Sequence, residues 1–162
     1  MKKLCITILV VLMAWATGQA QSCLPQGINF TYQWQVDSFA VNYPGCQVIE
    51  GDVIIKQSSI TNLVGLNPID SIGGSVTIEN NPYLYSLNGL DNLVYINGTL
   101  RLHNNDYFGS LNGLSGLTVI GGDLSIYNND KLDNVGGLGD LTKIGGGLTV
   151  VRNSSLDNFL GL

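Results

Sequence analysis

The sequence predicts an all-β fold, a parallel β-helix or solenoid with coils of about 24 residues and a short N-terminal capping helix. A Gly-Leu pair recurs every 24 residues, and apolar residues recur in columns at the same step. One stretch of every repeat also alternates apolar and polar residues, as strands do. A fixed period of this length is typical of proteins in which each repeat forms one coil stacked on the last. The glycines of the pair are Gly65, Gly89, Gly113, Gly137 and Gly161.

The repeat unit reads L-x-G-L-x-x-L-x-x-I-x-G-x-L-x-I-x-N-N-x-x-L. In residues 74–79, Val76 and Ile78 are expected to face inward, and they alternate with outward Thr77 and Glu79. Stacking pairs each such strand in parallel and in register with its equivalent, about 4.8 Å away. Apolar residues of one column then contact their own copies, which explains why these columns hold no charged residue.

The solenoid is expected to span residues 47–162 and to hold about five coils. Its first copy is imperfect, because the motif from Ile49 to Ile55 repeats after 23 residues instead of 24. The missing residue falls between Ile55 and Ile60. A new repeat begins just before 159–162, so we expect either a piece of a longer protein or a chain that frays at its last coil.

Two further columns are assigned structural roles. The glycines suit a corner that needs positive φ or a place where two backbones approach closely. The paired asparagines suit the next corner, where Asn tolerates left-handed geometry and its amide can bond the backbone or the Asn of the next coil. Calcium binding by 104–106 and 128–130 is the alternative, but these segments lack the β-roll nonapeptide and the EF-hand spacing, so no metal site is expected. The residues are Gly74, Gly98, Gly122 and Gly146, with Asn80, Asn104 and Asn128.

Residues 1–20 are expected to be a secretory signal peptide, with Lys2 and Lys3 before an apolar stretch and small residues ending at Ala20. That stretch is too short for a comfortable membrane span, and no later one qualifies, so the mature chain is predicted to have no transmembrane segment. Loss of the two lysines leaves five basic against twelve acidic residues, a formal charge of −7. An acidic chain without a basic patch argues against nucleic acid and anionic lipid as partners.

Export also removes Cys5, which leaves Cys23 and Cys46 on either side of the segment before the repeats. An even pair in an oxidising compartment favours a disulfide. The alternative is a lipidated Cys23, although residues 20–23 lack the aliphatic and small residues of a good lipobox.

Residues 21–46 are expected to cap the first coil with one short amphipathic helix. Thr31 is the candidate N-cap, and Pro44 and Gly45 end the helix. Trp34 falls off the apolar stripe and is expected to be a rim contact of this cap. The residues at helical spacing are Tyr32, Val36, Phe39, Ala40 and Tyr43.

The outward strand positions form the candidate binding face, because no two coils match there and a solenoid presents varied residues on a regular scaffold. The alternative is a merely solvated face. The candidates are Lys56, Thr77, Glu79, Arg101, His103, Ser125, Tyr127 and Thr149. Tyr83 and Tyr107, which share a column, are secondary candidates, since tyrosine favours binding surfaces; corner packing is their alternative role.

No catalytic constellation is apparent in the sequence. His103 is the only histidine, and the G-x-S-x-G, H-E-x-x-H and Walker motifs are missing. Polysaccharide-cleaving β-helices cluster several carboxylates or basic residues on one face, whereas among Asp123, Asp130, Asp133, Asp140 and Asp157 only Asp133 and Asp157 share a column. We therefore expect no enzyme and no cofactor.

The opening Cys46–Ile55 and the repeats L-x-x-I-x-G-x-L-x-I resemble the receptor L domain, the leucine-rich, right-handed β-helical module of the insulin and EGF receptor ectodomains. Residues 28–46 are similar to the lead-in of secreted Bacteroidetes members. The resemblance covers about residues 23–162 and implies an extracellular binding or adhesive role, with no ligand specified.

Taken together, these features predict a secreted or cell-surface module that binds an extracellular protein or glycan and catalyses no reaction. The alternatives are a structural repeat spacer of a larger surface protein and, third, a polysaccharide-acting β-helix enzyme.

Overall fold

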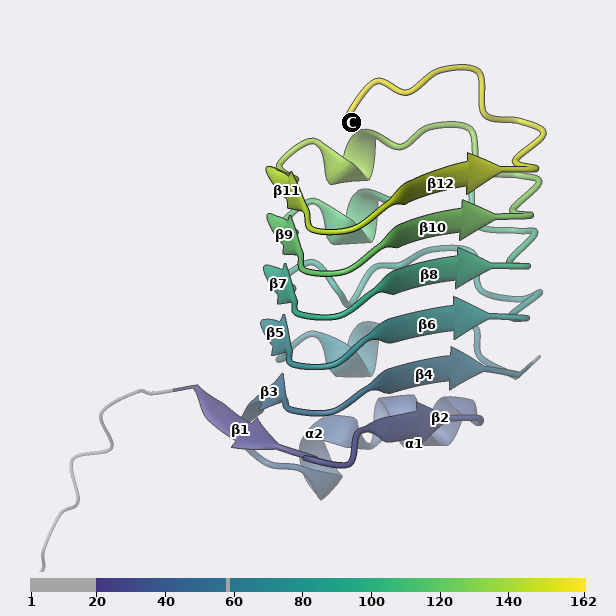
Figure 1. Cartoon of the computed structure of the whole chain (residues 1–162). Helices are drawn as coiled ribbons and strands as arrows, with labels where there is room; N and C mark the ends of the chain where they lie inside the picture. Colours follow the sequence, from purple (N-terminus) through teal and green to yellow (C-terminus); the bar gives the residue numbers. More distant parts are fainter. Residues whose placement is uncertain (1–19, 58) are drawn as a thin grey trace, which may run out of the picture.

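The computed structural model describes residues 20–57 and 59–162, and they form a parallel β-solenoid, as predicted (Figure 1). The expected signal peptide lies, except for its last residue, outside the described residues. Two six-stranded parallel sheets run along the stack, and each coil adds one strand to each sheet. The long sheet contains β2 (Ile28–Phe30), β4 (Val53–Lys56), β6 (Val76–Glu79), β8 (Leu100–His103), β10 (Leu124–Tyr127) and β12 (Leu148–Val151).

The short sheet was not foreseen as a separate layer. It contains β1 (Gln21–Cys23), β3 (Cys46–Ile49), β5 (Ser71–Ile72), β7 (Tyr95–Ile96), β9 (Val119–Ile120) and β11 (Lys143–Ile144). Single turns of 3-10 helix lie on the remaining side of three coils, at η1 (Val64–Leu66), η2 (Asn112–Leu114) and η3 (Gly136–Leu138). The coil cross-section therefore has two strand walls and a third wall of turns.

The apolar columns fill the space between these walls. Val76, Leu100 and Leu124 pair in register on successive strands, and all three are buried. Because each inward residue stacks on its own copy, one continuous core runs along the solenoid. This burial supplies the hydrophobic stabilisation of a fold with few helices.

Close backbone approach, and not positive φ, accounts for the glycines that precede the long strands. A Cβ on Gly98 would lie 2.8 Å from the backbone of Gly74 in the preceding coil, so no side chain fits at this position. The left-handed corner lies at the first Asn of each pair: Asn80, Asn104 and Asn128 have φ of 57°, 55° and 57°. The glycines that precede the long strands are therefore not at a corner that needs positive φ.

The segment before the repeats forms a coil of its own. β1 and β2 extend the two sheets, and two short helices, α1 (Gln33–Asp37) and α2 (Phe39–Asn42), replace the single helix that was expected. The helices are separated at Ser38, whose φ and ψ of −92° and 3° are not helical. The N-terminus of α1 is held by the side chain of Gln35, whose Oε1 accepts hydrogen bonds from the backbone N–H groups of Thr31 and Tyr32 at 2.7 and 2.9 Å.

Burial in this segment follows only part of the predicted stripe. Val36 and Phe39 are fully buried, whereas Tyr32 is 58% exposed. Trp34, which was expected to lie off the stripe, is 62% exposed. α1 packs beside η1, where the backbone of Val36 lies against Gly65. The Cys23–Cys46 disulfide joins β1 to β3 with a Cα–Cα distance of 5.7 Å. The N-terminal end of the core is therefore covered and covalently tied.

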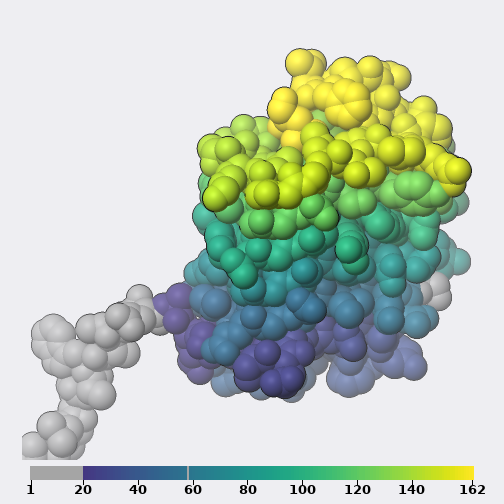
Figure 2. All heavy atoms as spheres, in the orientation of Figure 1, coloured from purple at the N-terminus to yellow at the C-terminus, as the bar shows by residue number. Residues whose placement is uncertain are grey.

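The last coil lies at the opposite end of the stack (Figure 2). Leu148 of β12 is 51% exposed, although Leu124, its partner in β10, is fully buried. Within the described residues, no helix combines the length and apolar character needed to cross a membrane.

Candidate functional site

The eight strand-face candidates lie on the outer side of the long sheet, which we call the long-sheet face. In-register pairing arranges the outward residues in two columns, one on each side of the strand centres. The first column is Ile54, Thr77, Arg101, Ser125 and Thr149; the second is Lys56, Glu79, His103, Tyr127 and Val151. The scaffold thus brings residues that are 24 apart in sequence into contact distance on neighbouring strands.

A connected cluster occupies the C-terminal half of this face. Nε2 of His103 lies 2.8 Å from Oγ of Ser125 on β10, and its ring meets that of Tyr127 edge-on, with centroids 5.7 Å apart. Arg152 donates a hydrogen bond to the Tyr127 hydroxyl, and its Cζ lies 5.4 Å from the centroid of the same ring. Such a cation–π contact adds to the hydrogen bond in fixing the tyrosine.

Arg152 was not among the predicted site residues. It occupies the column of Asn80, Asn104 and Asn128 and has the same left-handed backbone, with φ of 57°. A non-Gly, non-Asn residue in that region is uncommon, so the break in the Asn column was the signal that could have pointed to it.

Burial lowers the pKa of His103, and the nearby positive charge of Arg101 lowers it further, while the carboxylate of Glu79 acts in the opposite direction. The imidazole is therefore neutral at neutral pH, with one nitrogen donating and the other accepting. A neutral histidine beside a serine hydroxyl is also the arrangement of a catalytic base and its nucleophile. Within residues 20–57 and 59–162, however, no hydrogen bond joins Glu79 to the imidazole to orient it, although their Cα atoms are paired.

The second Asn of each pair forms a buried ladder along the corner beside this face. Asn105 donates from Nδ2 to the carbonyls of Ile78 and His103 at 2.8 and 2.9 Å, and its Oδ1 accepts from the N–H of Asn81 at 3.1 Å. Asn129 repeats the pattern one coil later. These amides satisfy backbone groups, and no cluster of three His, Cys, Asp or Glu lies near them in the described chain.

The first Asn of each pair forms an outer, more exposed ladder. Asn104 donates from Nδ2 to Oδ1 of Asn80 at 3.2 Å, and Asn128 donates to Oδ1 of Asn104 at 3.0 Å. Each amide therefore points its donor toward the preceding coil.

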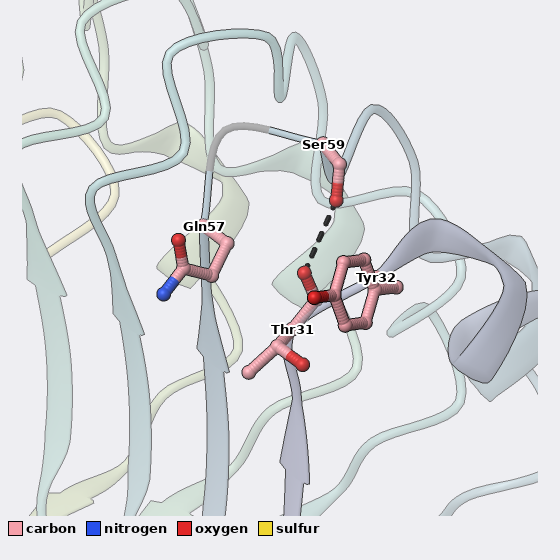
Figure 3. Close-up of a pocket in the computed structure, with 4 residues that line it drawn as sticks. All are labelled: Thr31, Tyr32, Gln57 and Ser59. Carbon is pink, nitrogen blue, oxygen red and sulfur yellow. Dashed lines mark hydrogen bonds between the residues drawn. The ribbon is translucent and has the colours of Figure 1, made fainter.

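Two adjoining pockets lie along the N-terminal part of this corner, and we call them together the corner groove. One, of about 290 Å³, lies beside the turn after β2 (Figure 3). The other, of about 450 Å³, lies one coil further on. The first is lined by Thr31, Tyr32, Gln57 and Ser59, and the second by Lys56, Gln57, Asn80, Pro82, Asn104 and Asp106. Of these, only Lys56 was predicted as a binding residue; the one-residue shortening between Ile55 and Ile60 was the signal that could have located the groove.

The secondary tyrosine candidates are exposed, but they do not pair with each other. The ring of Tyr107 meets Tyr85 edge-on, with centroids 5.8 Å apart, while Tyr83 is 54% exposed beside Pro82. The shared column therefore predicted the exposure of Tyr83 and Tyr107, and the aromatic contact is between Tyr107 and Tyr85.

Comparison with known protein families gives a match over part of the chain. Residues 45–112 match the receptor L domain. The match runs from β3 to the start of η2, so it includes Lys56, Thr77, Glu79, Arg101 and His103, and it ends before the rest of the face. No curated protein and no solved structure matches the chain. Receptor L domains are non-catalytic modules that bind extracellular ligands, and the disulfide is in keeping with an extracellular location.

Proposed function

We propose that this protein is an exported, non-enzymatic recognition module that binds a protein at a cell surface through its long-sheet face. The observation that carries the proposal is the cluster of His103, Ser125 and Tyr127, whose relative positions are fixed by the register of β8 and β10, and which Arg152 joins from the corner after β12. The match of residues 45–112 to the receptor L domain supports a ligand-binding role. The likeness of residues 28–46 to the lead-in of secreted Bacteroidetes proteins favours a bacterial surface.

The residue types on the face favour a protein over a glycan as its ligand. Tyr and Arg dominate the residues that contribute most binding energy in protein interfaces, and this face offers Arg101, Tyr127 and Arg152. Tyr127 is already held by two neighbours, so binding costs little of its side-chain entropy. Aliphatic Ile54 and Val151 add apolar contact area at either end of the columns.

The test is binding of the fluorescently labelled protein to intact cells of the source organism and of its neighbours or hosts, read by flow cytometry. We expect Arg101→Ala combined with Tyr127→Ala to weaken binding about tenfold or more. The matched control is Lys143→Ala combined with Tyr95→Ala, which removes one basic residue and one tyrosine from the short sheet and should leave binding intact.

Treatment of the cells distinguishes the ligand classes. Protease treatment should abolish binding, whereas periodate oxidation of surface glycans should not. Equal binding of both double variants would exclude this face, and absence of binding by the unchanged protein would favour the structural spacer.

A further inference from the structure

The corner groove lies where the first repeat departs from the others. The next three coils place an Asn with φ near 57° at this corner, whereas the shortened first coil places Gln57 there, with φ of 115°. A non-glycine residue at such a φ is costly, so the surrounding structure must hold it in place. Gln57 lines both pockets and is the residue that connects them.

The outer Asn ladder ends at this groove. In the outer ladder each Nδ2 donates to the preceding Asn, but the coil before Asn80 has no Asn at that position. Asn80 is therefore the first amide of the outer ladder, and it lines the second pocket together with Gln57. A side-chain amide that lines a cavity can bond a polar ligand or water there.

The lining combines one aromatic ring with hydroxyl and amide groups. Tyr32 is largely exposed and forms one side of the first pocket, opposite Gln57 (Figure 3). Ser59 donates to the carbonyl of Thr31 at 3.1 Å, which ties the two sides of this pocket together. Sugar hydroxyls both donate and accept hydrogen bonds, as serine and threonine hydroxyls do, so they suit a wall of amides and hydroxyls.

The charges of the groove cancel. The second pocket has one ammonium, from Lys56, and one carboxylate, from Asp106, and the first pocket has no ionised side chain. Neither pocket is lined by Leu, Ile, Val or Phe, although apolar side chains are what anchors a peptide in a pocket. The corners from Thr31 to Asn104 span three coil steps, roughly 14 Å at the strand spacing, which is enough for several sugar units.

We propose that the corner groove binds a neutral oligosaccharide, with the Tyr32 ring as its stacking surface and Gln57 and Asn80 as hydrogen-bonding residues. This site is separate from the long-sheet face, and only Lys56 lies at the boundary of both. Saccharide binding at the corner groove does not depend on the proposed binding of a protein at the long-sheet face.

The test uses maltohexaose, cellohexaose, laminarihexaose, β-1,4-mannohexaose and N-acetylchitohexaose, titrated separately into the purified protein by calorimetry. Hexagalacturonate is the anionic comparison. We expect at least one neutral saccharide to bind saturably with a Kd of about 1 mM or tighter, and hexagalacturonate to bind at least about tenfold more weakly. Absence of saturable binding by every neutral saccharide, or a preference for hexagalacturonate, would overturn the proposal.

Two variants, each with a matched control, locate the site. Asn80→Gly preserves the left-handed backbone and removes the amide, and Asn128→Gly does the same at the other end of the ladder, away from the groove. Asn80→Gly and Tyr32→Ala should each weaken saccharide binding about tenfold, whereas Asn128→Gly and Tyr95→Ala should not. The Arg101→Ala, Tyr127→Ala variant should also retain saccharide binding. Equal effects of Asn80→Gly and Asn128→Gly, with unchanged thermal unfolding, would exclude the groove.

Discussion

Asn105 shows how a single side chain connects successive coils. Its Nδ2 bonds the carbonyl of Ile78 in the preceding coil, its Oδ1 accepts from Asn81, and its own N–H donates to Oδ1 of Asn129 in the following coil. All three asparagines are fully buried. The inner ladder therefore satisfies backbone groups that the left-handed corner would otherwise leave unpaired inside the protein.

Replacing the inner and the outer Asn of one pair should have very different effects. Asn105→Ala leaves buried groups of Ile78, His103 and Asn81 without this partner, and we expect it to lower the free energy of unfolding by about 3 kcal/mol. Asn104→Gly keeps the left-handed corner and loses only partly exposed hydrogen bonds, so about 1 kcal/mol is expected. Urea unfolding followed by circular dichroism measures both, and similar losses would contradict the ladder's structural role.

At the scale of elements, the N-terminal coil closes one end of the core. β1 and β2 complete the two sheets, and α1 and α2 cover the space that turns occupy in later coils. The disulfide ties β1 to β3 across 23 residues, so this coil cannot detach from the stack without carrying the first repeat with it. The end of the solenoid is thereby protected both by packing and by a covalent bond.

Reduction of the disulfide should destabilise the protein by roughly 3 kcal/mol, because the cross-link removes loop entropy from the unfolded chain. Unfolding of the oxidised and reduced protein by urea measures the difference without altering any side-chain volume. The control is thiol titration of the unfolded exported chain without reductant, which should find no free thiol. One free thiol with a lipid mass on the N-terminal peptide would instead support a lipidated Cys23, and two free thiols would exclude the bridge.

For the whole molecule, the 24-residue period was sufficient to predict the long sheet and its core, since Val76, Leu100 and Leu124 lie in the columns that the spacing defines. The short sheet was missed because strands of two residues, such as β5, are too brief to show alternation. The cluster around Tyr127 depends on Arg152, which is 25 residues away in sequence. The contact between these two side chains results from the stacking of coils and is visible only in the folded structure. The corner groove likewise lies where the first repeat is one residue shorter than the others. Its shape depends on Tyr32 and Ser59 in neighbouring turns.

Protection of the backbone amides from hydrogen exchange should fall along the stack toward the last coil. Leu100 and Leu124 donate their N–H groups to the following coil, to the carbonyls of Asp123 and Gly147 at 2.9 Å each. Leu148 holds the same position in β12, where no coil of the described chain follows, and its side chain is half exposed. In a solenoid each coil is stabilised mainly by its neighbours, so a coil with one neighbour opens more readily.

Hydrogen exchange measured by NMR tests this gradient. We expect the amide of Leu148 to exchange close to the rate of an unstructured chain, that of Leu124 more slowly, and that of Leu100 near the limit set by global unfolding. Measurements at two protein concentrations provide the control, because stacking of two molecules through β12 would protect Leu148 only in the more concentrated sample. Uniform protection from β8 to β12 at both concentrations would show that the last coil is held as firmly as the centre, contrary to the nearest-neighbour account.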